Sequence, residues 1–178
     1  MTKFVLITGC SGGGKSTLLE ELSARGYPTI AEPGRRIIAQ ERVAGGDALP
    51  WLNPATFARR GIDMSKADLA RADALTGWVF FDRGLIDSAV AMETAVGTSL
   101  LETLGRTCQY HRKVFVAPPW RAIFAGDANR RHSFEDAVTE FQRIRSALTT
   151  LGYDICMLPN CATAKRADYV LETLDELR

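Results

Sequence analysis

The 178-residue sequence lacks the features that would place it outside ordinary soluble enzymes and binding proteins. No apolar run reaches the roughly 18 residues that a membrane-spanning helix requires. The first residues do not combine a basic segment, an apolar stretch and a small-residue cleavage site, so no secretory signal is recognised. We therefore expect a cytoplasmic protein that makes no contact with a membrane.

Cysteine, histidine and net charge are also scarce. The four cysteines, at positions 10, 108, 156 and 161, form no CxxC pair, which argues against a zinc site or a disulfide framework. The two histidines, at positions 111 and 132, have no spacing typical of a triad or a metal site. The formal net charge of +1 provides no overall field for a polyanion, so we expect no nucleic-acid partner. The sequence leaves the oligomeric state open.

What the sequence does contain is an alternation of short apolar runs and longer amphipathic stretches. This alternation predicts a parallel sheet with helices on both faces, and the length suits one domain over residues 1–178. The strands are expected at 4–8, 28–31, 78–81, 114–117 and 155–158. The helices are expected at 16–25, 35–44, 54–75, 87–96, 99–110, 133–151 and 164–177, with Asn53 and Ser133 as N-terminal caps.

The segment Gly9–Ser16 reads GCSGGGKS and matches the P-loop pattern GxxxxGK[ST]. It follows an apolar strand and opens a helix, as the motif requires, and a bare glycine-rich turn would not need a lysine and a serine there. Lys15 is expected at the β- and γ-phosphates and Ser16 on Mg²⁺. The remaining nucleotide contacts are predicted at Gly9, Ser11, Gly12, Gly13, Gly14 and Thr17.

An apolar strand that ends in Asp82 and Arg83 is the second motif, typical of the acidic position that assists Mg²⁺ in P-loop proteins. Asp82 is expected to hold the metal directly or through water, and Arg83 places a cation beside the phosphates. The alternative is that Asp82 caps the next helix and pairs with Arg83. The sequence thus predicts ATP and Mg²⁺ as ligands. No NKxD motif, typical of guanine recognition, follows the fourth strand, which argues against a signalling GTPase; the sequence favours ATP but leaves the choice between adenine and guanine open.

Together, the motifs resemble the AAA_28 family of predicted P-loop ATPases, which is similar in fold to nucleoside and nucleotide kinases. The resemblance covers nearly the whole chain and is carried by GCSGGGKST, AEPGRRII, GGDALPW, FFDRGLIDS, VAPPW and DANRRHSFEDA. It implies a three-layer P-loop sandwich, with a five-stranded parallel sheet in the order 2-3-1-4-5.

The comparison with kinases implies further roles. Glu32 resembles the acid that accepts the proton of the acceptor hydroxyl, and Pro33 is expected to hold it extended. Asp82 and Arg83 resemble the acid–arginine pair of deoxynucleoside kinases, although Gly84 stands where those kinases commonly have serine. Arg35, together with Arg36, opens the next helix. Cations there oppose the helix dipole, which favours an anionic acceptor nearby.

The kinase resemblance also implies a lid at about residues 118–132, between the fourth strand and the next helix. Arg121 would stack on the base, while Arg130 or Arg131 would reach the phosphates. The alternative is a solvated basic loop, neutralised by the acids at positions 135 and 136. Trp51 either lines the acceptor pocket or fills the core under a loop.

Three functions remain open on the sequence. The first is a Mg²⁺-dependent kinase for a small, nucleoside- or nucleotide-like molecule, with Lys15, Glu32, Asp82, Arg83 and the lid arginines 130 and 131 as catalytic residues. The second is an ATPase in which water replaces the acceptor and hydrolysis drives a regulatory or conformational cycle. The third is a nucleotide-dependent interaction module with negligible turnover.

Overall fold

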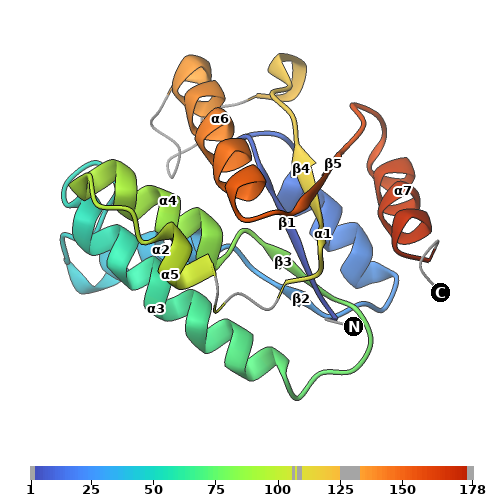
Figure 1. Ribbon diagram of the computed structural model, residues 1–178, viewed down its shortest axis with the longest axis horizontal. Helices are drawn as coiled ribbons and strands as arrows, with labels where there is room; N and C mark the ends of the chain where they lie inside the picture. The colour runs from blue at the N-terminus through green and yellow to red at the C-terminus, as the bar shows by residue number, and fades with distance from the viewer. Residues whose placement is uncertain (1–2, 106, 108–109, 125–132, 176–178) are drawn as a thin grey trace.

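Five parallel strands form a single sheet in the order β2-β3-β1-β4-β5, as the family resemblance implies (Figure 1). The computed structural model describes residues 3–105, 107, 110–124 and 133–175. The strands are β1 (Phe4–Gly9), β2 (Thr29–Ile30), β3 (Val79–Asp82), β4 (Lys113–Ala117) and β5 (Asp154–Met157). The prediction of an α/β fold is confirmed.

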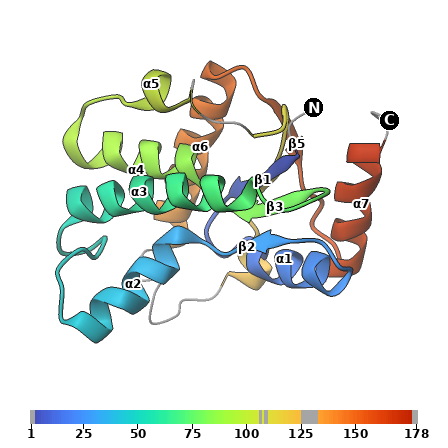
Figure 2. The ribbon, with the colours of Figure 1, turned by 90° about the horizontal axis from the view of Figure 1, so that it is seen from below.

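Helices cover both faces of this sheet (Figure 2). One face carries α1 (Lys15–Ala24) and α7 (Thr163–Asp175), which pack against each other. The other face carries α3 (Pro54–Ala72), α4 (Leu85–Val96), α5 (Leu101–Gly105) and α6 (Phe134–Thr150). Helix α2 (Pro33–Ala44) packs against α3, and a short 3₁₀ turn, η1 (Arg121–Ile123), follows β4.

The central strands β1, β3 and β4 are buried on both faces because each face meets a helical layer. Val5, Ile7 and Phe80 pack with the inner sides of α1 and α7 in one core cluster. Leu6 and Phe81, one residue along each strand, pack with α3, α4 and α6 in the other. The sheet therefore holds the carboxyl ends of β1 and β3 rigidly, and both sequence motifs lie at that edge.

Several helix bounds differ by a few residues from the sequence-based expectation, as where α3 ends at Ala72 instead of residue 75, and two of the differences have a visible cause. Helix α5 ends at Gly105 instead of continuing to Tyr110, because Tyr110 forms a parallel bridge with Phe4 at the sheet. Helix α4 begins at Leu85, since the Asp87 carboxylate accepts a hydrogen bond of 3.1 Å from the Gly84 N–H. The expected caps at Asn53 and Ser133 are both present.

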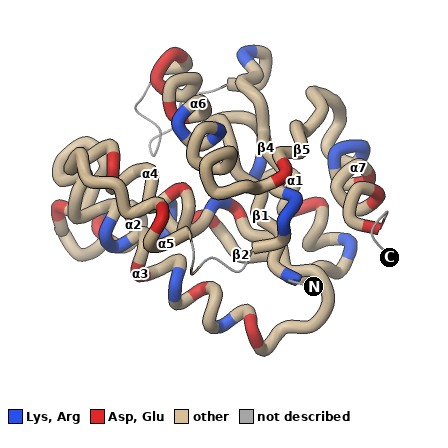
Figure 3. Tube along the Cα trace, viewed as in Figure 1, with Lys and Arg blue, Asp and Glu red and all other residues tan. Residues whose placement is uncertain are grey.

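Lysine and arginine alternate with aspartate and glutamate along the helices that the structure describes (Figure 3). Within the described ranges, no helix combines the length and apolar character needed to cross a membrane.

Candidate active site

The loop between β1 and α1 has the geometry of a phosphate cradle. Gly14 caps α1 in the left-handed conformation, with φ of 74°, which a residue with a side chain rarely adopts. A Cβ atom there would also meet the Arg166 guanidinium at 2.7 Å. The first turn of α1 leaves backbone N–H groups without helical partners, and these are suited to bind an anion. The predicted P-loop thus has the backbone that its sequence requires.

Lys15 begins α1 and is only 6% exposed. Its Nζ donates a hydrogen bond of 2.8 Å to the carbonyl oxygen of Cys10, within the same loop. Burial lowers the pKa of Lys15, and the nearby positive charge of Arg83 lowers it further. Phosphate oxygens would be stronger acceptors for this ammonium than a carbonyl, because charge-assisted hydrogen bonds are the stronger ones.

Asp82, the last residue of β3, lies beside β1 and close to the start of α1. Its Oδ2 accepts a hydrogen bond of 3.0 Å from the Ser16 hydroxyl, while its buried Oδ1 has no hydrogen-bond partner among the residues that the structure describes. Burial and the charge of Glu32 raise the pKa of Asp82. An unpartnered carboxylate oxygen beside a serine hydroxyl fits Mg²⁺, which prefers oxygen ligands and keeps several waters. Within the described residues, no group of three or more His, Cys, Asp or Glu side chains could hold a metal.

Arg83 follows in the left-handed backbone region, with φ of 58°, and its side chain is buried. Its guanidinium meets three carboxylates from different elements. The NH1 group lies 3.1 Å from Asp87 and 3.0 Å from Glu140, and Nε lies 3.6 Å from Glu32. Burial opposes its charge, but these carboxylates raise its pKa, so Arg83 is a fixed cation. Its hydrogen bonds and pairs tie α4 and α6 to the end of β3.

Glu32 immediately precedes α2 and adopts φ of −51° and ψ of 121°. This extended conformation is the one expected of a residue before proline. The Glu32 side chain makes no cap hydrogen bond to α2. It lies between two arginines instead. Its Oε2 accepts a hydrogen bond of 3.2 Å from Arg35 Nε, and its Oε1 forms an ion pair with Arg83. The extended backbone expected before Pro33 is therefore present, while the carboxylate pairs with Arg35 on α2 and with Arg83.

Two cavities meet at these side chains. The first, of about 680 Å³, is lined by the cradle residues Ser11, Gly12, Gly14, Lys15, Ser16 and Thr17 and by Trp120, Ile123, residues 161–163 and Arg166. The second, of about 440 Å³, is bounded by α2, α3, α4 and α6, with Ile38, Pro50, Phe57, Ala58 and Ala91 among its walls. Ser11, Glu32, Arg35 and Arg83 line both cavities. Gly9, Gly13 and Asp82 line neither of these two cavities.

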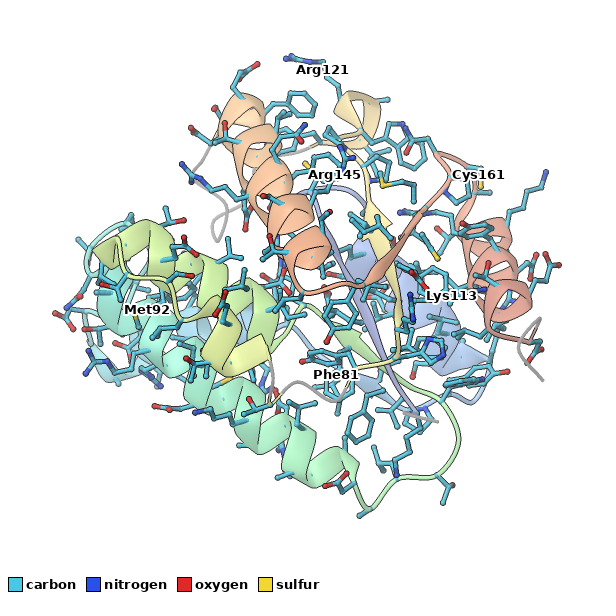
Figure 4. The ribbon with its side chains drawn as sticks, viewed as in Figure 1. Phe81, Met92, Lys113, Arg121, Arg145 and Cys161 are labelled. Carbon is cyan, nitrogen blue, oxygen red and sulfur yellow. The ribbon has the colours of Figure 1, made fainter. Side chains whose placement is uncertain are left out.

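The predicted lid residues are placed only in part. Arg121 begins η1 and points outward, as Figure 4 shows. Its NH2 group donates a hydrogen bond of 2.8 Å to Glu135 Oε1, and its Cζ lies 4.5 Å from the centre of the Phe134 ring. For Arg121, this pairing agrees with the alternative of a solvated basic loop that is neutralised by nearby acids. Arg130 and Arg131 lie outside the described residues, and their roles stay predictions.

The arginines at the start of α2 have acidic partners within the protein. Arg36 donates 2.7 Å to the buried Asp68 of α3, and Arg35 pairs with Glu32. Their position at a helix start is thus explained without an anionic acceptor. Trp51 is half-buried and does not line the second cavity.

Three residues of the site were missed by the sequence reasoning. Asp87 follows Arg83 by four positions, a helical spacing that could have indicated the pair. Glu140 lies on α6, and its contact with Arg83 depends on how that helix crosses the sheet. Arg166 lies on α7, and nothing in the local sequence distinguishes it from the other arginines.

The described histidine has a structural position away from these cavities. His111 is buried, accepts a hydrogen bond of 3.2 Å from the Lys113 N–H, and packs edge-on against Trp78. Burial lowers its pKa. His132 lies outside the described residues.

The sequence and the structure were compared with those of known proteins. The family model AAA_28, described as an AAA domain, matches residues 4–166. No curated protein matches the chain by sequence. Among solved structures, deoxyadenosine kinase from M. mycoides with dCMP and dCDP is 16% identical, with a TM-score of 0.64 over 98% of this chain and 100% of that chain.

Two further solved structures have the same fold. Shikimate kinase from Acinetobacter baumannii, in complex with shikimate, is 14% identical, with a TM-score of 0.61 over 100% of this chain and 96% of that chain. The NadR protein in complex with NR is 19% identical, with a TM-score of 0.70 over 98% of this chain and 51% of that chain. At these identities the likeness concerns the fold, which is that of P-loop kinases.

Proposed function

The chain belongs to the AAA_28 family, and from that premise we propose that it is a Mg²⁺-dependent kinase that transfers the γ-phosphoryl group of ATP to a hydroxyl of a small molecule. We further propose that residues 1–178 act as a single domain, since both core clusters pack against the same sheet.

The observation that carries this proposal is the meeting of two cavities at Glu32 and Arg83. The first cavity contains the phosphate cradle, and the second opens beside it with apolar walls from α2, α3 and α4. Hydrolysis needs only a water molecule at the γ-phosphate, and a second cavity of about 440 Å³ exceeds that need. A cavity of this size suits an organic acceptor held next to the transferred group.

In this mechanism the cradle and Lys15 bind the phosphates. Lys15 exchanges the Cys10 carbonyl for oxygens of the β- and γ-phosphates, where its charge stabilises the transferred group. Ser16 and Asp82 would hold Mg²⁺, which when bound neutralises charge on the phosphates. Because Asp82 Oδ1 is buried and no described residue forms a hydrogen bond with it, binding of the ion would also remove an unfavourable state of the free protein.

Glu32 is the proposed base. Its carboxylate lines both cavities, so an acceptor hydroxyl in the second cavity would lie between it and the γ-phosphate. Arg83 keeps the Glu32 carboxylate at the boundary through a 3.6 Å ion pair and presents a fixed positive charge to the reacting phosphate. Arg130 or Arg131 is proposed to add positive charge from the lid to the phosphates. Arg121 is proposed to leave Glu135 and stack on the nucleobase of ATP.

The walls of the second cavity indicate the acceptor's shape. Phe57 and Ile38 supply apolar surface, and Gly34 and Gly61, which also line the cavity, allow their neighbours to pack closely. Ring-bearing hydroxyl compounds fit such walls, and the solved structures of similar fold include a deoxyadenosine kinase and a shikimate kinase. Nucleosides and shikimate are therefore the first acceptors to test.

The test measures ADP release from ATP with Mg²⁺, with and without nucleosides, shikimate and related hydroxyl compounds. The kinase proposal expects release that depends on one acceptor class, together with a phosphorylated product detected by mass spectrometry. Glu32→Gln should lower kcat by about 100-fold or more with little change in ATP affinity, since it removes proton acceptance. Glu20→Gln, at an exposed position of α1, is the matched control.

Acceptor-independent phosphate release that Glu32→Gln abolishes would favour the ATPase alternative. Tight ATP binding without turnover under any condition would favour the interaction module. Either result refutes the kinase proposal while leaving nucleotide binding intact.

A further inference from the structure

Arg166 lies on α7, far along the chain from the P-loop, yet its side chain reaches the cradle. It is 2% exposed, and its NH1 group donates a hydrogen bond of 3.3 Å to the Gly14 carbonyl oxygen. Its Nε and NH2 groups are buried without a hydrogen-bond partner within the described part of the chain. The guanidinium lies 5.8 Å from the centre of the Trp120 ring.

A buried guanidinium with unpaired donors is unfavourable, because it has lost water without gaining an opposite charge. Burial accordingly lowers the pKa of Arg166, and among the described residues no carboxylate acts on it to raise the pKa. Arg83 shows the contrast, since it is equally buried but meets three carboxylates. Buried polar groups are normally paired, so an exception calls for a missing partner.

The surroundings of Arg166 identify the partner by its chemistry. It lines the first cavity together with Gly14, Thr17, Trp120 and Ile123. The P-loop backbone binds α- and β-phosphates, whereas its lysine reaches the β- and γ-phosphates. Lys15 turns toward Cys10, at the start of the loop, while Arg166 contacts Gly14, at its end. Arg166 therefore contacts a different part of the loop from the Lys15 ammonium.

We propose that Arg166 is a second phosphate-binding cation, and that the α-phosphate of a bound nucleoside triphosphate is the counter-ion its guanidinium lacks. This inference rests on the proposed nucleotide binding and adds a residue to it. The unpaired Nε and NH2 groups form one edge of the guanidinium, the arrangement that binds two oxygens of one phosphate. The Arg166 edge reaches the ligand by reorienting next to Trp120 on nucleotide binding.

Arg166→Met tests the proposal because two roles predict opposite outcomes. A structural tie between α7 and the P-loop would make the unliganded variant less stable. If Arg166 instead binds phosphate and is unpaired in the free protein, the unliganded variant should be as stable as the wild type or more stable, because an unpaired buried charge is removed. Thermal unfolding of the free proteins and calorimetric titration with ATP, GTP and tripolyphosphate measure both properties.

We expect the Kd values for ATP and GTP to rise by the same factor, about 10- to 100-fold, the effect of a lost hydrogen bond to a charged group. Tripolyphosphate should lose affinity as well. Arg166→Lys should recover part of the affinity, since it restores the charge but not the paired donors. Arg25→Met is the matched control, because Arg25 also joins α1 to α7, through Asp168 at 2.6 Å, but lies outside the cavity lining.

Three outcomes would overturn this inference while nucleotide binding stands. The first is wild-type affinity in Arg166→Met. The second is a loss confined to one base, which would make Arg166 a base-reading residue. The third is a lower melting temperature of the free variant, which would make Arg166 a structural link between α7 and the P-loop. A wild-type protein that binds no nucleotide would refute the proposed function itself, and this inference with it.

Discussion

Gly84 separates the Asp82–Arg83 pair from α4, at a position where deoxynucleoside kinases commonly have serine. Its φ is 175°, an extended conformation open to any residue, so backbone freedom does not explain the glycine. A Cβ atom at this position would collide with the Tyr110 hydroxyl and lie 3.0 Å from Tyr110 Cζ. The Tyr110 hydroxyl accepts a hydrogen bond of 3.2 Å from the Leu85 N–H, at the first turn of α4.

Gly84→Ala should therefore destabilise the protein through this collision. Tyr110 has little room to retreat, because it is 5% exposed and packs edge-on against Phe81 at 5.4 Å. Overpacking in a core costs about 1–3 kcal/mol, and the displaced hydrogen bond adds about 1 kcal/mol. Restricting the unfolded chain offsets about 0.4–1 kcal/mol, which leaves a net loss of about 1–3.6 kcal/mol.

A double-mutant cycle with Tyr110→Phe isolates the cause. Tyr110→Phe alone should lower the free energy of unfolding by about 1 kcal/mol, the value of one hydrogen bond. In the double variant the colliding oxygen is absent, so the loss should fall short of the sum of the single losses by about 1 kcal/mol or more. Urea unfolding monitored by circular dichroism measures all four proteins. Additive losses, or a Gly84→Ala protein as stable as the wild type, would refute this explanation.

Three shorter predictions concern ionisation and capping. Burial raises the pKa of Asp82, so its contribution to stability is complete below the unfolded pKa and is lost as pH rises through the folded pKa. Asp82→Asn should therefore reduce the loss of unfolding free energy with rising pH, measured by urea unfolding at several pH values. An unchanged pH dependence in this variant would contradict the prediction. Because burial lowers the pKa of His111, its NMR titration should lie below the roughly 6.5 of a free imidazole, and a midpoint at or above that value would count against its burial. Asn53→Ala removes the side-chain oxygen that accepts from the Thr56 N–H at 3.2 Å, so the free energy of unfolding should fall by about 1 kcal/mol; a change under about 0.3 kcal/mol would show that this cap contributes little.

The sequence was sufficient to predict the sheet, the strand order and the cradle, because each depends on local patterns and on a family resemblance. Ser16 and Asp82 lie together as expected, since β1 and β3 are neighbours and their carboxyl ends share one edge. Helix bounds were predicted less well where a distant contact decides them, as at Tyr110, which pairs with Phe4.

The remainder of the site depends on how helices cross the sheet. The Arg83–Glu140 pair requires α6 to pass over the end of β3, and no spacing in the sequence encodes that crossing. Arg166 reaches Gly14 because α7 packs beside α1, again a tertiary event. The suggestion of an anionic acceptor from Arg36 lost its basis in the same way, since the partner is Asp68 on α3.

The pairing of β1 with β4 has a consequence for how the cradle is assembled during synthesis. The Cys10 N–H, inside the P-loop, donates 2.8 Å to the Ala117 carbonyl oxygen, and Gly9 pairs with Ala117 in the sheet. The loop is thus anchored by a strand that leaves the ribosome much later than the loop itself. Contacts so distant in sequence form slowly, because a long chain must close before they are gained. A nascent chain that ends before β4 would carry the complete P-loop sequence without a fixed cradle.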